Sequence, residues 1–260
     1  MLLRPPYRYS TITTGLVGWW PFDDGAVTGI QLDNSGHPQN FGTLNGGASR
    51  TTNGFGRPIR GSGGALNLVS ANSQYMDAGA DLSLCPAAIS ITLWVNSSSF
   101  PNAYNCLAIR PQNGSGSYYY AFYITSAGKL AAYLGPGGNI IDPATTAMSI
   151  NKWYHLALTY NAATNLILYI NGATEASLSA NSNQVSVAGN LWIGGQQTTT
   201  RYCNCRMRDV RIYNRALSAA EVFAISREAY QPTLDIETIA LMVSVSQAVA
   251  GQSRGMFILP

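Results

Sequence analysis

Apolar and polar residues alternate over most of the chain, in short segments separated by turn residues. In residues 153–160, 166–170 and 207–213 every second side chain can face a core. Asn171-Gly172 directly follows the second of these segments, and this dipeptide favours a tight hairpin turn. The pattern predicts an all-β sandwich or jelly roll with roughly ten to thirteen strands.

One short helix is predicted after the last of these segments. Ser218 is a suitable N-cap residue, and Glu221 three residues later completes a capping box. Apolar residues follow at Val222, Phe223 and Ile225. We therefore expect a helix from about residue 219 to residue 227.

The two ends of the chain lack the alternating pattern. Residues 1–14 are rich in Pro, Arg and Tyr, and Pro5-Pro6 favours an extended path. Residues 230–260 end in the apolar sequence Gly255-Met-Phe-Ile-Leu-Pro260. Because such a terminus is poorly suited to water, we expect it to dock on a neighbouring subunit or on its own domain. The predicted organisation is an extended arm at 1–14, one domain at 15–229 and an apolar tail at 230–260.

The composition points to an uncharged, hydrogen-bonding surface. Charged residues make up 10% of the 260 residues, against about 25% in an average soluble domain. Asn, Gln, Ser, Thr and Gly supply the polarity, together with 15 Tyr. Such a surface suits sugars or other protein surfaces better than phosphates. The net charge of +3 and the scattered Lys and Arg residues argue against nucleic-acid binding.

The N-terminal residues do not resemble a secretory leader. Residues 1–10 contain no apolar run of the ~7–15 residues that a leader needs. The chain also contains no stretch of ~18 apolar residues that would span a membrane. A removed leader is one explanation, and release by another route such as lysis is the other. Met1 favours release, so we expect a virion or an extracellular surface as the location.

Four cysteines, Cys85, Cys106, Cys203 and Cys205, leave the redox compartment open. Cys203 and Cys205 would point to the same face of a strand. A zinc site needs further ligands at characteristic spacing, and neither His37 nor His155 lies close to them in sequence. We expect structural thiols, with disulfides as the alternative.

A longer series of motifs runs through residues 15–229 in a fixed order. In chain order the motifs are Gly15-Leu-Val-Gly-Trp-Trp-Pro-Phe-Asp23, Asp33-Asn-Ser-Gly36, Gly42-Thr-Leu-Asn-Gly46, Gly64-Ala-Leu-Asn-Leu68, Gln74-Tyr-Met-Asp-Ala-Gly79, Ile89-Ser-Ile-Thr-Leu-Trp94, Trp153-Tyr-His-Leu-Ala157, Leu168-Tyr-Ile-Asn-Gly172 and Asp209-Val-Arg-Ile-Tyr-Asn-Arg-Ala-Leu-Ser-Ala-Ala-Glu221. In this series the chain resembles the laminin-G-like (LamG) domains of the concanavalin A-like lectin and glucanase superfamily.

The resemblance implies an all-β, two-sheet antiparallel jelly-roll sandwich of the concanavalin A-like type. Its two sheets would be curved, one of them concave, with rim loops that bind sugars or calcium in some members. Family members usually carry a small residue where this chain has Cys205, and two acidic residues where it has Arg208-Asp209. The missing first carboxylate weakens any metal site there. The arms also resemble those of single-domain proteins of tailed-phage genomes, which are thought of as virion surface or decoration proteins.

The chain lacks the residues that hydrolysis on this scaffold would need. A retaining glycosidase needs two carboxylates about 5–5.5 Å apart, and laminarinase-like members place Glu-x-Asp-x-x-Glu on one strand face. The nearest sequence here, Asp235-Ile-Glu237, lies in the tail. His155 lies inside a predicted strand, where a half-buried, hydrogen-bonded histidine is expected. We therefore predict that the protein is not an enzyme.

Calcium is the metal that the sequence fits best, as a structural ion. Asp23, Asp24 and Asp33 flank Gly-rich loops, whose carbonyl groups and carboxylates are the ligands that calcium prefers. The alternative is that these residues only form turns, which Asp favours through its own backbone hydrogen bonds. No other cofactor is expected.

The run Tyr118-Tyr119-Tyr120 is the candidate for sugar contact. Alternation predicts that Tyr118 and Tyr120 share one face of a strand, where their rings would stack on pyranose faces. Phe122 continues the same set, so core packing is the alternative.

Two functions remain open. The first is a non-catalytic structural or surface-display protein, such as a phage-type virion decoration or tail-associated protein. Its arms would bind other protein subunits, and its jelly roll would face outward and adhere to glycans. The second is a secreted lectin-like carbohydrate-binding or adhesion module that recognises cell-surface glycans.

Overall fold

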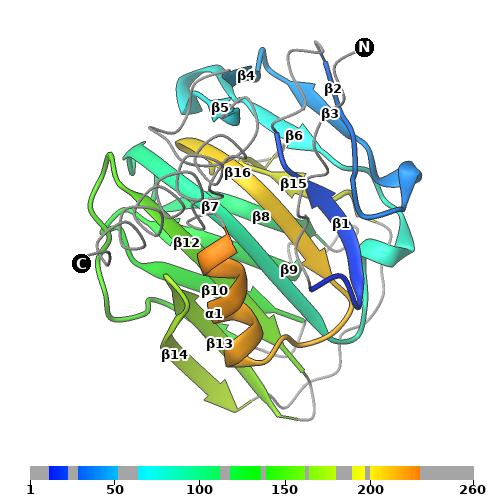
Figure 1. The fold of residues 1–260 in the computed structure, drawn as a ribbon. Coiled ribbons are helices and arrows are strands. Elements are labelled where there is room, and N and C mark those ends of the chain that lie inside the picture. The colour runs from blue at the N-terminus through cyan, green and yellow to red at the C-terminus, as the bar shows by residue number, and fades with distance from the viewer. Residues whose placement is uncertain are drawn as a thin grey trace, which may run out of the picture.

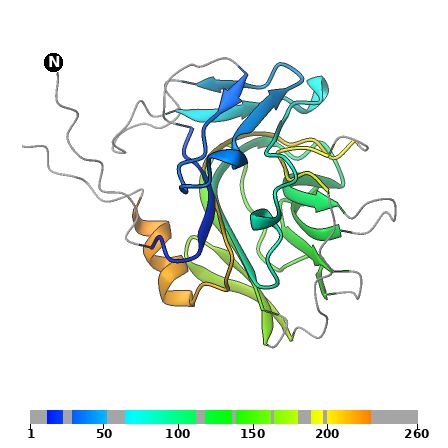
Figure 2. The same cartoon turned by 90° about the vertical axis from the view of Figure 1, so that its right-hand side faces the viewer.

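A computed structural model of the protein describes residues 12–22, 29–51, 64–111, 118–135, 139–161, 164–179, 189–196 and 200–228. Within these residues, two antiparallel β-sheets pack face to face, and one α-helix lies on the outside of the first (Figures 1 and 2). The predicted arm at 1–14 is described only from residue 12, and the tail at 230–260 lies outside the described residues. The predicted all-β sandwich is confirmed.

The first sheet, sheet A, has the strand order β14-β13-β12-β7-β16-β5-β4, and β1 also pairs with β16. Its strands are β1 (Leu16–Trp20), β4 (Ser49–Thr51), β5 (Ala65–Leu68), β7 (Ile89–Ser99), β12 (Trp153–Tyr160), β13 (Asn165–Ile170), β14 (Ala173–Ser179) and β16 (Asn204–Tyr213). β1 and β5 share one side of β16, because β1 pairs with residues 210–213 and β5 with residues 205–207.

The second sheet, sheet B, has the order β11-β10-β9-β8-β15-β6-β3-β2. Its strands are β2 (Ile30–Gln31), β3 (Gly42–Asn45), β6 (Tyr75–Asp77), β8 (Tyr104–Pro111), β9 (Tyr118–Thr125), β10 (Leu130–Leu134), β11 (Asn139–Ile141) and β15 (Trp192–Ile193). Three short 3₁₀ turns lie at Pro38–Asn40, Ser70–Asn72 and Leu82–Leu84. The described residues contain 16 strands, more than predicted, because several are only two or three residues long.

The core lies between the two sheets and follows from the alternating pattern. Ile91 and Leu93 of β7, Leu156 and Leu158 of β12, and Phe122 of β9 are fully buried in one apolar cluster. Burying a side chain of this size contributes about 1.5–3 kcal/mol to stability. The residues between them point outward, so each sheet also has an outer face. The side chains on that face determine whether it packs against another element or is available for binding.

The predicted hairpin turn is confirmed and carries a packing role. Asn171 and Gly172 both have positive φ, at 53° and 82°, as a type I′ turn requires. A Cβ atom at Gly172 would lie 2.6 Å from the hydroxyl of Ser226. Glycine at this position therefore lets the β13–β14 hairpin contact the helix.

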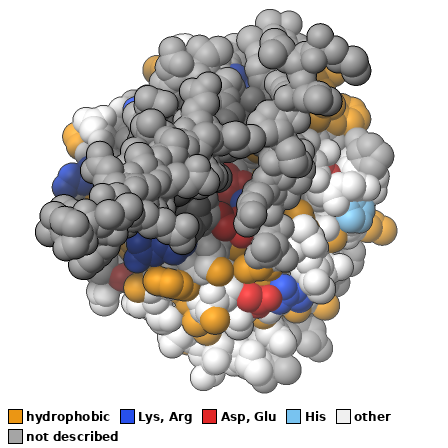
Figure 3. Space-filling model, viewed as in Figure 1, with side chains coloured by type: hydrophobic (Ala, Val, Ile, Leu, Met, Phe, Trp, Pro, Cys, Tyr) orange, Lys and Arg blue, Asp and Glu red, His pale blue; other side chains and the backbone are white. Residues whose placement is uncertain are grey.

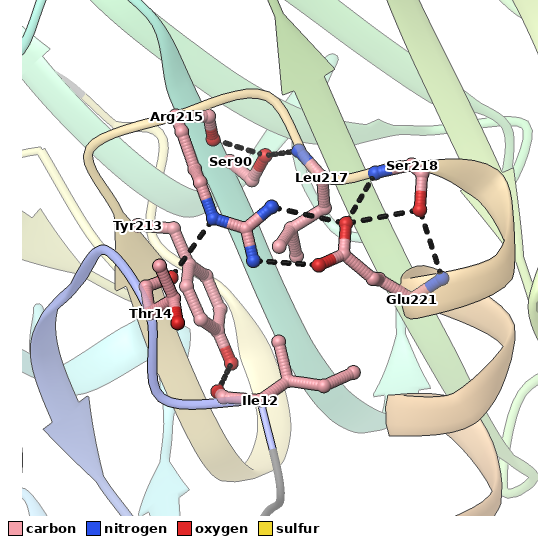
Figure 4. Close-up of polar contacts among 8 residues, drawn as sticks. All are labelled: Ile12, Thr14, Ser90, Tyr213, Arg215, Leu217, Ser218 and Glu221. Carbon is pink, nitrogen blue, oxygen red and sulfur yellow. Dashed lines mark hydrogen bonds and ion pairs between the residues drawn. The ribbon is translucent and has the colours of Figure 1, made fainter.

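The helix α1 (Ala219–Glu228) starts at the predicted capping box (Figure 4). The backbone N–H of Glu221 donates to Ser218 Oγ at 3.3 Å, and the N–H of Ser218 donates to Glu221 Oε2 at 2.8 Å. Val222 and Ile225 face sheet A and pack in one cluster with Leu16, Trp19, Ala157, Tyr169, Tyr213 and Leu217. We call this group the helix-covered cluster.

The two ends of the domain are joined beside α1 (Figure 4). The hydroxyl of Tyr213 donates to the carbonyl of Ile12 at 3.2 Å, and Arg215 Nε donates to the carbonyl of Thr14 at 2.9 Å. Arg215 also forms an ion pair with Glu221. The chain therefore enters and leaves the described domain on the sheet A side.

The surface on this side is sparsely charged. Among the coloured side chains of Figure 3, Lys, Arg, Asp and Glu lie singly or in small groups between hydrophobic and uncharged polar atoms. None of the helices in the described residues combines the length and the hydrophobicity that a membrane span requires.

Candidate functional site

The outer face of sheet B, on the far side of the molecule from α1 (Figure 2), is lined with aromatic side chains. We call this surface the tyrosine face. Its aromatic members are Tyr75, Tyr104, Tyr118, Tyr123, Tyr133, Trp192 and Tyr202. They come from β6, β8, β9, β10, β15 and the segment before β16, so antiparallel pairing gathers residues that are far apart in the sequence.

Four of these rings form the centre of the tyrosine face. Tyr104 lies 5.4 Å from Tyr123 and 5.9 Å from Tyr133 between ring centroids. Tyr118 lies 6.4 Å from both Tyr123 and Tyr133. Most of these contacts are edge-to-face, the geometry that the ring quadrupoles favour. Small cross-strand neighbours leave space for the rings, since Ala121 lies opposite Tyr133 and Ala131 opposite Tyr123.

Arg201 holds these rings in position. Its Nη1 atom donates to the hydroxyl of Tyr118 at 2.9 Å and to that of Tyr123 at 3.2 Å. Its guanidinium carbon also lies 5.1 Å from the ring centroid of Tyr104 and 5.5 Å from that of Tyr123. A guanidinium within about 6 Å of a ring is attracted to the π-face. Arg201 therefore orders three tyrosines at once.

An exposed carboxylate lies at the edge of the same cluster. Asp142 accepts hydrogen bonds from the hydroxyls of Tyr104 and Tyr133, and these two hydroxyl oxygens lie 2.9 Å apart. The hydrogen bond to Asp142 raises the pKa of Tyr104, and burial together with Asp142 raises the pKa of Tyr133. Both phenols thus stay protonated at neutral pH and keep their donor hydrogens.

Three further rings extend the tyrosine face towards β6. Tyr75 lies 6.3 Å from both Trp192 and Tyr202 between ring centroids. Asp77 accepts from Trp192 Nε1 at 3.3 Å and from Asn190 Nδ2 at 2.9 Å. The tyrosine face therefore combines aromatic rings with hydroxyl, amide and carboxylate groups in fixed positions. Such a set suits a ligand with apolar C–H faces and several hydroxyls.

The predicted pair Tyr118 and Tyr120 is separated by a β-bulge. Arg110 pairs with Tyr120 and Pro111 with Tyr118, so Tyr119 is an extra residue in β9. Tyr118 therefore points to the tyrosine face, whereas Tyr120 points into the core. Tyr120 is 0% exposed and donates its hydroxyl to the carbonyl of Leu84 at 3.1 Å. The prediction that these two residues share a face is wrong, and Tyr120 is not accessible to a ligand.

Sequence reasoning missed most of the tyrosine face. Tyr104, Tyr133, Asp142 and Arg201 lie in four separate segments, and none stands in a recognisable motif. The single available signal was the high tyrosine content, which indicates a binding surface but does not locate it.

Of the three predicted calcium ligands, only Asp33 lies within the residues that the structure describes. Asp33 Oδ1 accepts from the N–H of Trp19 at 2.7 Å and of Ser35 at 2.9 Å, and Oδ2 accepts from Ser35 Oγ at 2.6 Å. Burial raises the pKa of Asp33. These bonds are those of a turn-forming residue that also fixes β1. Asp23 and Asp24 lie outside the described residues, and calcium there stays a prediction.

The remaining candidate ligands for metals do not come together. In the part of the chain that the structure describes, no group of three or more His, Cys, Asp or Glu side chains is arranged to hold a metal ion. The four cysteines are buried and remain thiols, as expected. His155 is more deeply buried than predicted, at 1% exposure, and neither ring nitrogen has a hydrogen-bond partner.

A family comparison agrees with this architecture. The model of the laminin-G-type family, described as the concanavalin A-like lectin/glucanases superfamily, matches residues 70–223, which is more than half of the chain. The chain belongs to this superfamily. The match includes most of the strands of both sheets and all the tyrosines of the tyrosine face. A search of curated proteins gives no match.

Several solved structures share the fold of this protein, although their sequence identity to it is low. The sialidase of Trypanosoma rangeli in complex with sialic acid has a TM-score of 0.62 and 16% identity, over 85% of this chain and 34% of that chain. The protein thus spans about a third of the length of that sialidase.

Two further structures match over a similar part of this superfamily member. Domain 4 of AbnA, an extracellular arabinanase from Geobacillus stearothermophilus in complex with arabinotriose, has a TM-score of 0.60 and 16% identity, over 81% of this chain and 98% of that domain. The binding domain of Paraclostridial Mosquitocidal Protein 1 has a TM-score of 0.63 and 17% identity, over 84% of this chain and 53% of that chain. At these identities the likeness concerns the fold.

Proposed function

We propose that this protein is a non-catalytic glycan-binding protein and that the tyrosine face is its binding surface. The observation that carries the proposal is the cluster of four ordered tyrosines with Arg201 and Asp142 at its edge. The half-buried rings of Tyr104, Tyr118 and Tyr133 offer stacking surfaces, whereas Tyr123 is fully buried and supports them from beneath. The hydroxyl and carboxylate groups offer hydrogen bonds to sugar hydroxyls. The lectin-like fold and the arabinotriose-bound domain of similar fold support it.

The carboxylates of the tyrosine face fit binding better than hydrolysis. Asp142 accepts from two tyrosine hydroxyls, and Asp77 accepts from Trp192 and Asn190. A glycosidase needs one carboxyl group to give a proton and a second to attack or to activate water. Asp77 and Asp142 instead position aromatic rings, so we assign no hydrolytic step to them.

The test is a glycan array followed by calorimetry with the full chain. Tyr118→Ala and Tyr133→Ala each remove a stacking surface, and each is expected to weaken sugar binding about fivefold to tenfold, the equivalent of about 1 kcal/mol. Phe223→Ala, on the exposed face of α1, is the matched control and should leave affinity unchanged. Absence of binding to any neutral, anionic or amino sugar by the wild-type protein would exclude the proposal.

Display on a larger particle is the second candidate, and one observation favours it. Both ends of the described domain lie beside α1 on the sheet A side, whereas the tyrosine face lies on the opposite side (Figure 2). Arms anchored to other protein subunits would then leave the tyrosine face turned outward. This arrangement fits a virion decoration or tail-associated protein, and equally an adhesion module at an extracellular surface.

Electron microscopy and light scattering of the full-length protein test this second candidate. A decoration protein should co-purify with, and bind to, large particles of regular shape. A protein that stays monomeric at all concentrations and is found apart from particles would leave only the lectin-like module.

A further inference from the structure

The tyrosine face has one corner, beside the edge strand β11, that presents only hydrogen-bond acceptors. Asp142 directly follows β11, and Tyr104 and Tyr133 both donate to the same oxygen of this residue, Oδ2. The two phenol oxygens also lie 2.9 Å apart, so a hydrogen shared between them stays inside the same group. Each phenol carries a single hydrogen, and neither therefore has another one to give to a ligand. We call these three residues the acceptor corner.

The second carboxylate oxygen of the corner, Asp142 Oδ1, remains available to a ligand. Asp142 is exposed, and within the described residues its only hydrogen bonds are the two to Oδ2. None of the ion pairs in that part of the chain includes Asp142. An ionised carboxylate has about four lone-pair sites and no hydrogen to donate. Asp142 thus offers a charged acceptor at the edge of the tyrosine face.

The other side of the ring cluster has the opposite hydrogen-bonding character. Arg201 Nη1 donates to the hydroxyls of Tyr118 and Tyr123. Because the Tyr118 hydroxyl accepts in this contact, its own hydrogen can go to a ligand, and the residue is only half-buried. The ring centroids of Tyr118 and Tyr133 lie 6.4 Å apart, close enough for one sugar residue to reach both sides.

This division determines which groups of a sugar suit the acceptor corner. A hydroxyl can donate to Asp142 Oδ1. The ammonium group of an amino sugar also donates and carries the opposite charge, and such charge-assisted hydrogen bonds are about twice as strong as neutral ones. The carboxylate of a sialic or uronic acid has no hydrogen to donate and would lie beside a like charge, which opposes binding.

We propose that Asp142 determines the selectivity of the tyrosine face, because its Oδ1 atom accepts from hydroxyl or ammonium groups of the glycan. Amino sugars then bind most tightly, neutral sugars less tightly and carboxylated sugars least. The inference rests on the glycan-binding function proposed above and adds the class of ligand to it. Asp142 has two roles in the site: Oδ2 orders the rings of Tyr104 and Tyr133, and Oδ1 contacts the sugar.

A glycan array that carries each backbone in a neutral, an amino and a carboxylated form tests this selectivity with the full chain. The three forms share length and linkage, so the comparison is made within whichever backbone the protein binds. At pH 6, where sugar amines are protonated, the amino form should bind about tenfold more tightly than the carboxylated form. This ratio should shrink as salt is added, because exposed charges are screened.

A pair of matched variants assigns the ratio to one residue. Asp142→Asn removes the charge and keeps the size and one acceptor oxygen, and it should bring the two affinities within about threefold of each other. Asp81→Asn is the control. It removes the same charge at the start of the 3₁₀ turn Leu82–Leu84, where Asn caps as well as Asp, and should keep the tenfold ratio. A purely structural role of Asp142 would lower all three affinities alike.

The outcomes separate this inference from the function on which it rests. Equal or tighter binding of the carboxylated form by the wild type would overturn the inference, and so would a ratio that Asp142→Asn leaves unchanged. In both cases the glycan-binding function would stand. Binding of no array member in any form would remove the glycan-binding function itself, and the inference with it.

Discussion

The outer faces of sheet A and sheet B are built from the same alternation and serve different purposes. On sheet A the outward residues of the helix-covered cluster are buried under α1, and the buried Arg211 beside them is paired with Asp209 and Glu228. On sheet B the outward residues are tyrosines, several of them half-exposed. An outward face with paired charges under a helix stabilises the fold, and an outward face with ordered rings is available for binding.

The geometry of β16 explains why charges can be buried on sheet A. Asp209 has a positive φ of 52°, at the register shift between Arg208 and Arg211. Its carboxylate thereby accepts from Trp19 Nε1 at 2.6 Å and from Arg211 Nε at 2.9 Å. Arg211 in turn lies 5.0 Å from the Trp19 ring centroid. The bulge therefore supplies the buried guanidinium with its partner.

The largest difference between the two faces is expected on removing a carboxylate from each. Asp209→Asn leaves the buried Arg211 without its closest counter-charge and should lower the free energy of unfolding by about 3 kcal/mol. Asp142→Asn on the tyrosine face replaces an exposed charged acceptor with a neutral one and should cost about 1 kcal/mol or less. Urea unfolding measures both, and equal losses would mean that the two faces do not differ as described.

A pH dependence should come from sheet A. Burial lowers the pKa of His155 from its ordinary 6.5 to about 3. As the pH falls below 6.5, the unfolded chain takes up a proton and the folded protein does not, so stability present above pH 6.5 is lost towards pH 3. The loss is about 1.4 kcal/mol per pH unit. Thermal unfolding between pH 7 and pH 5 measures it, and His155→Gln should remove most of the slope.

A smaller effect compares two arginine–aromatic contacts. Arg201→Gln removes two hydrogen bonds and several ring contacts on the tyrosine face, so it should cost about 1–2 kcal/mol and weaken sugar binding. Arg227→Gln removes an exposed contact on α1, 5.1 Å from the Phe223 ring centroid. It should change stability by less than about 0.5 kcal/mol and leave sugar binding intact. If the two substitutions changed the affinity for sugar equally, the tyrosine face would not be the sugar-binding surface.

The smallest effect concerns Asp33. Asp33→Asn weakens the bonds to the N–H groups of Trp19 and Ser35 and should lower stability by about 1 kcal/mol without calcium. Thermal unfolding with and without millimolar calcium decides the metal. An increase in melting temperature for the wild type that the variant loses assigns a structural calcium, and no increase leaves Asp33 a turn residue.

Short sequence motifs predicted the turn and the helix start correctly, because both depend on residues that are neighbours in the sequence. The hairpin at Asn171-Gly172 and the capping box of Ser218 and Glu221 lie within a few residues of the structures they form. Strands such as β2 and β15, with two residues each, have too few positions to show a period. The laminin-G-like motif order added the overall architecture, which the family match confirms.

The candidate site was less predictable for physical reasons. A single extra residue in β9, Tyr119, places Tyr118 and Tyr120 on opposite faces of sheet B, where regular alternation predicts the same face. Arg201 reaches the tyrosines from a segment about 80 residues away from Tyr118. Contacts of this kind depend on sheet order, which alternation within one strand does not encode.

The bonds between Tyr213 and Ile12 and between Arg215 and Thr14 have a mechanical consequence. α1 lies between the end of β16 and the C-terminal arm, so a force that separates the two arms first pulls α1 away from sheet A. It then acts on adjacent ends of the antiparallel pair of β1 and β16, where Leu16 is paired with Tyr213. The pair would then open like a zipper, one hydrogen bond after another, at low force. A load applied to the tyrosine face and held by both arms together would instead pass through the whole sandwich and leave this pair closed.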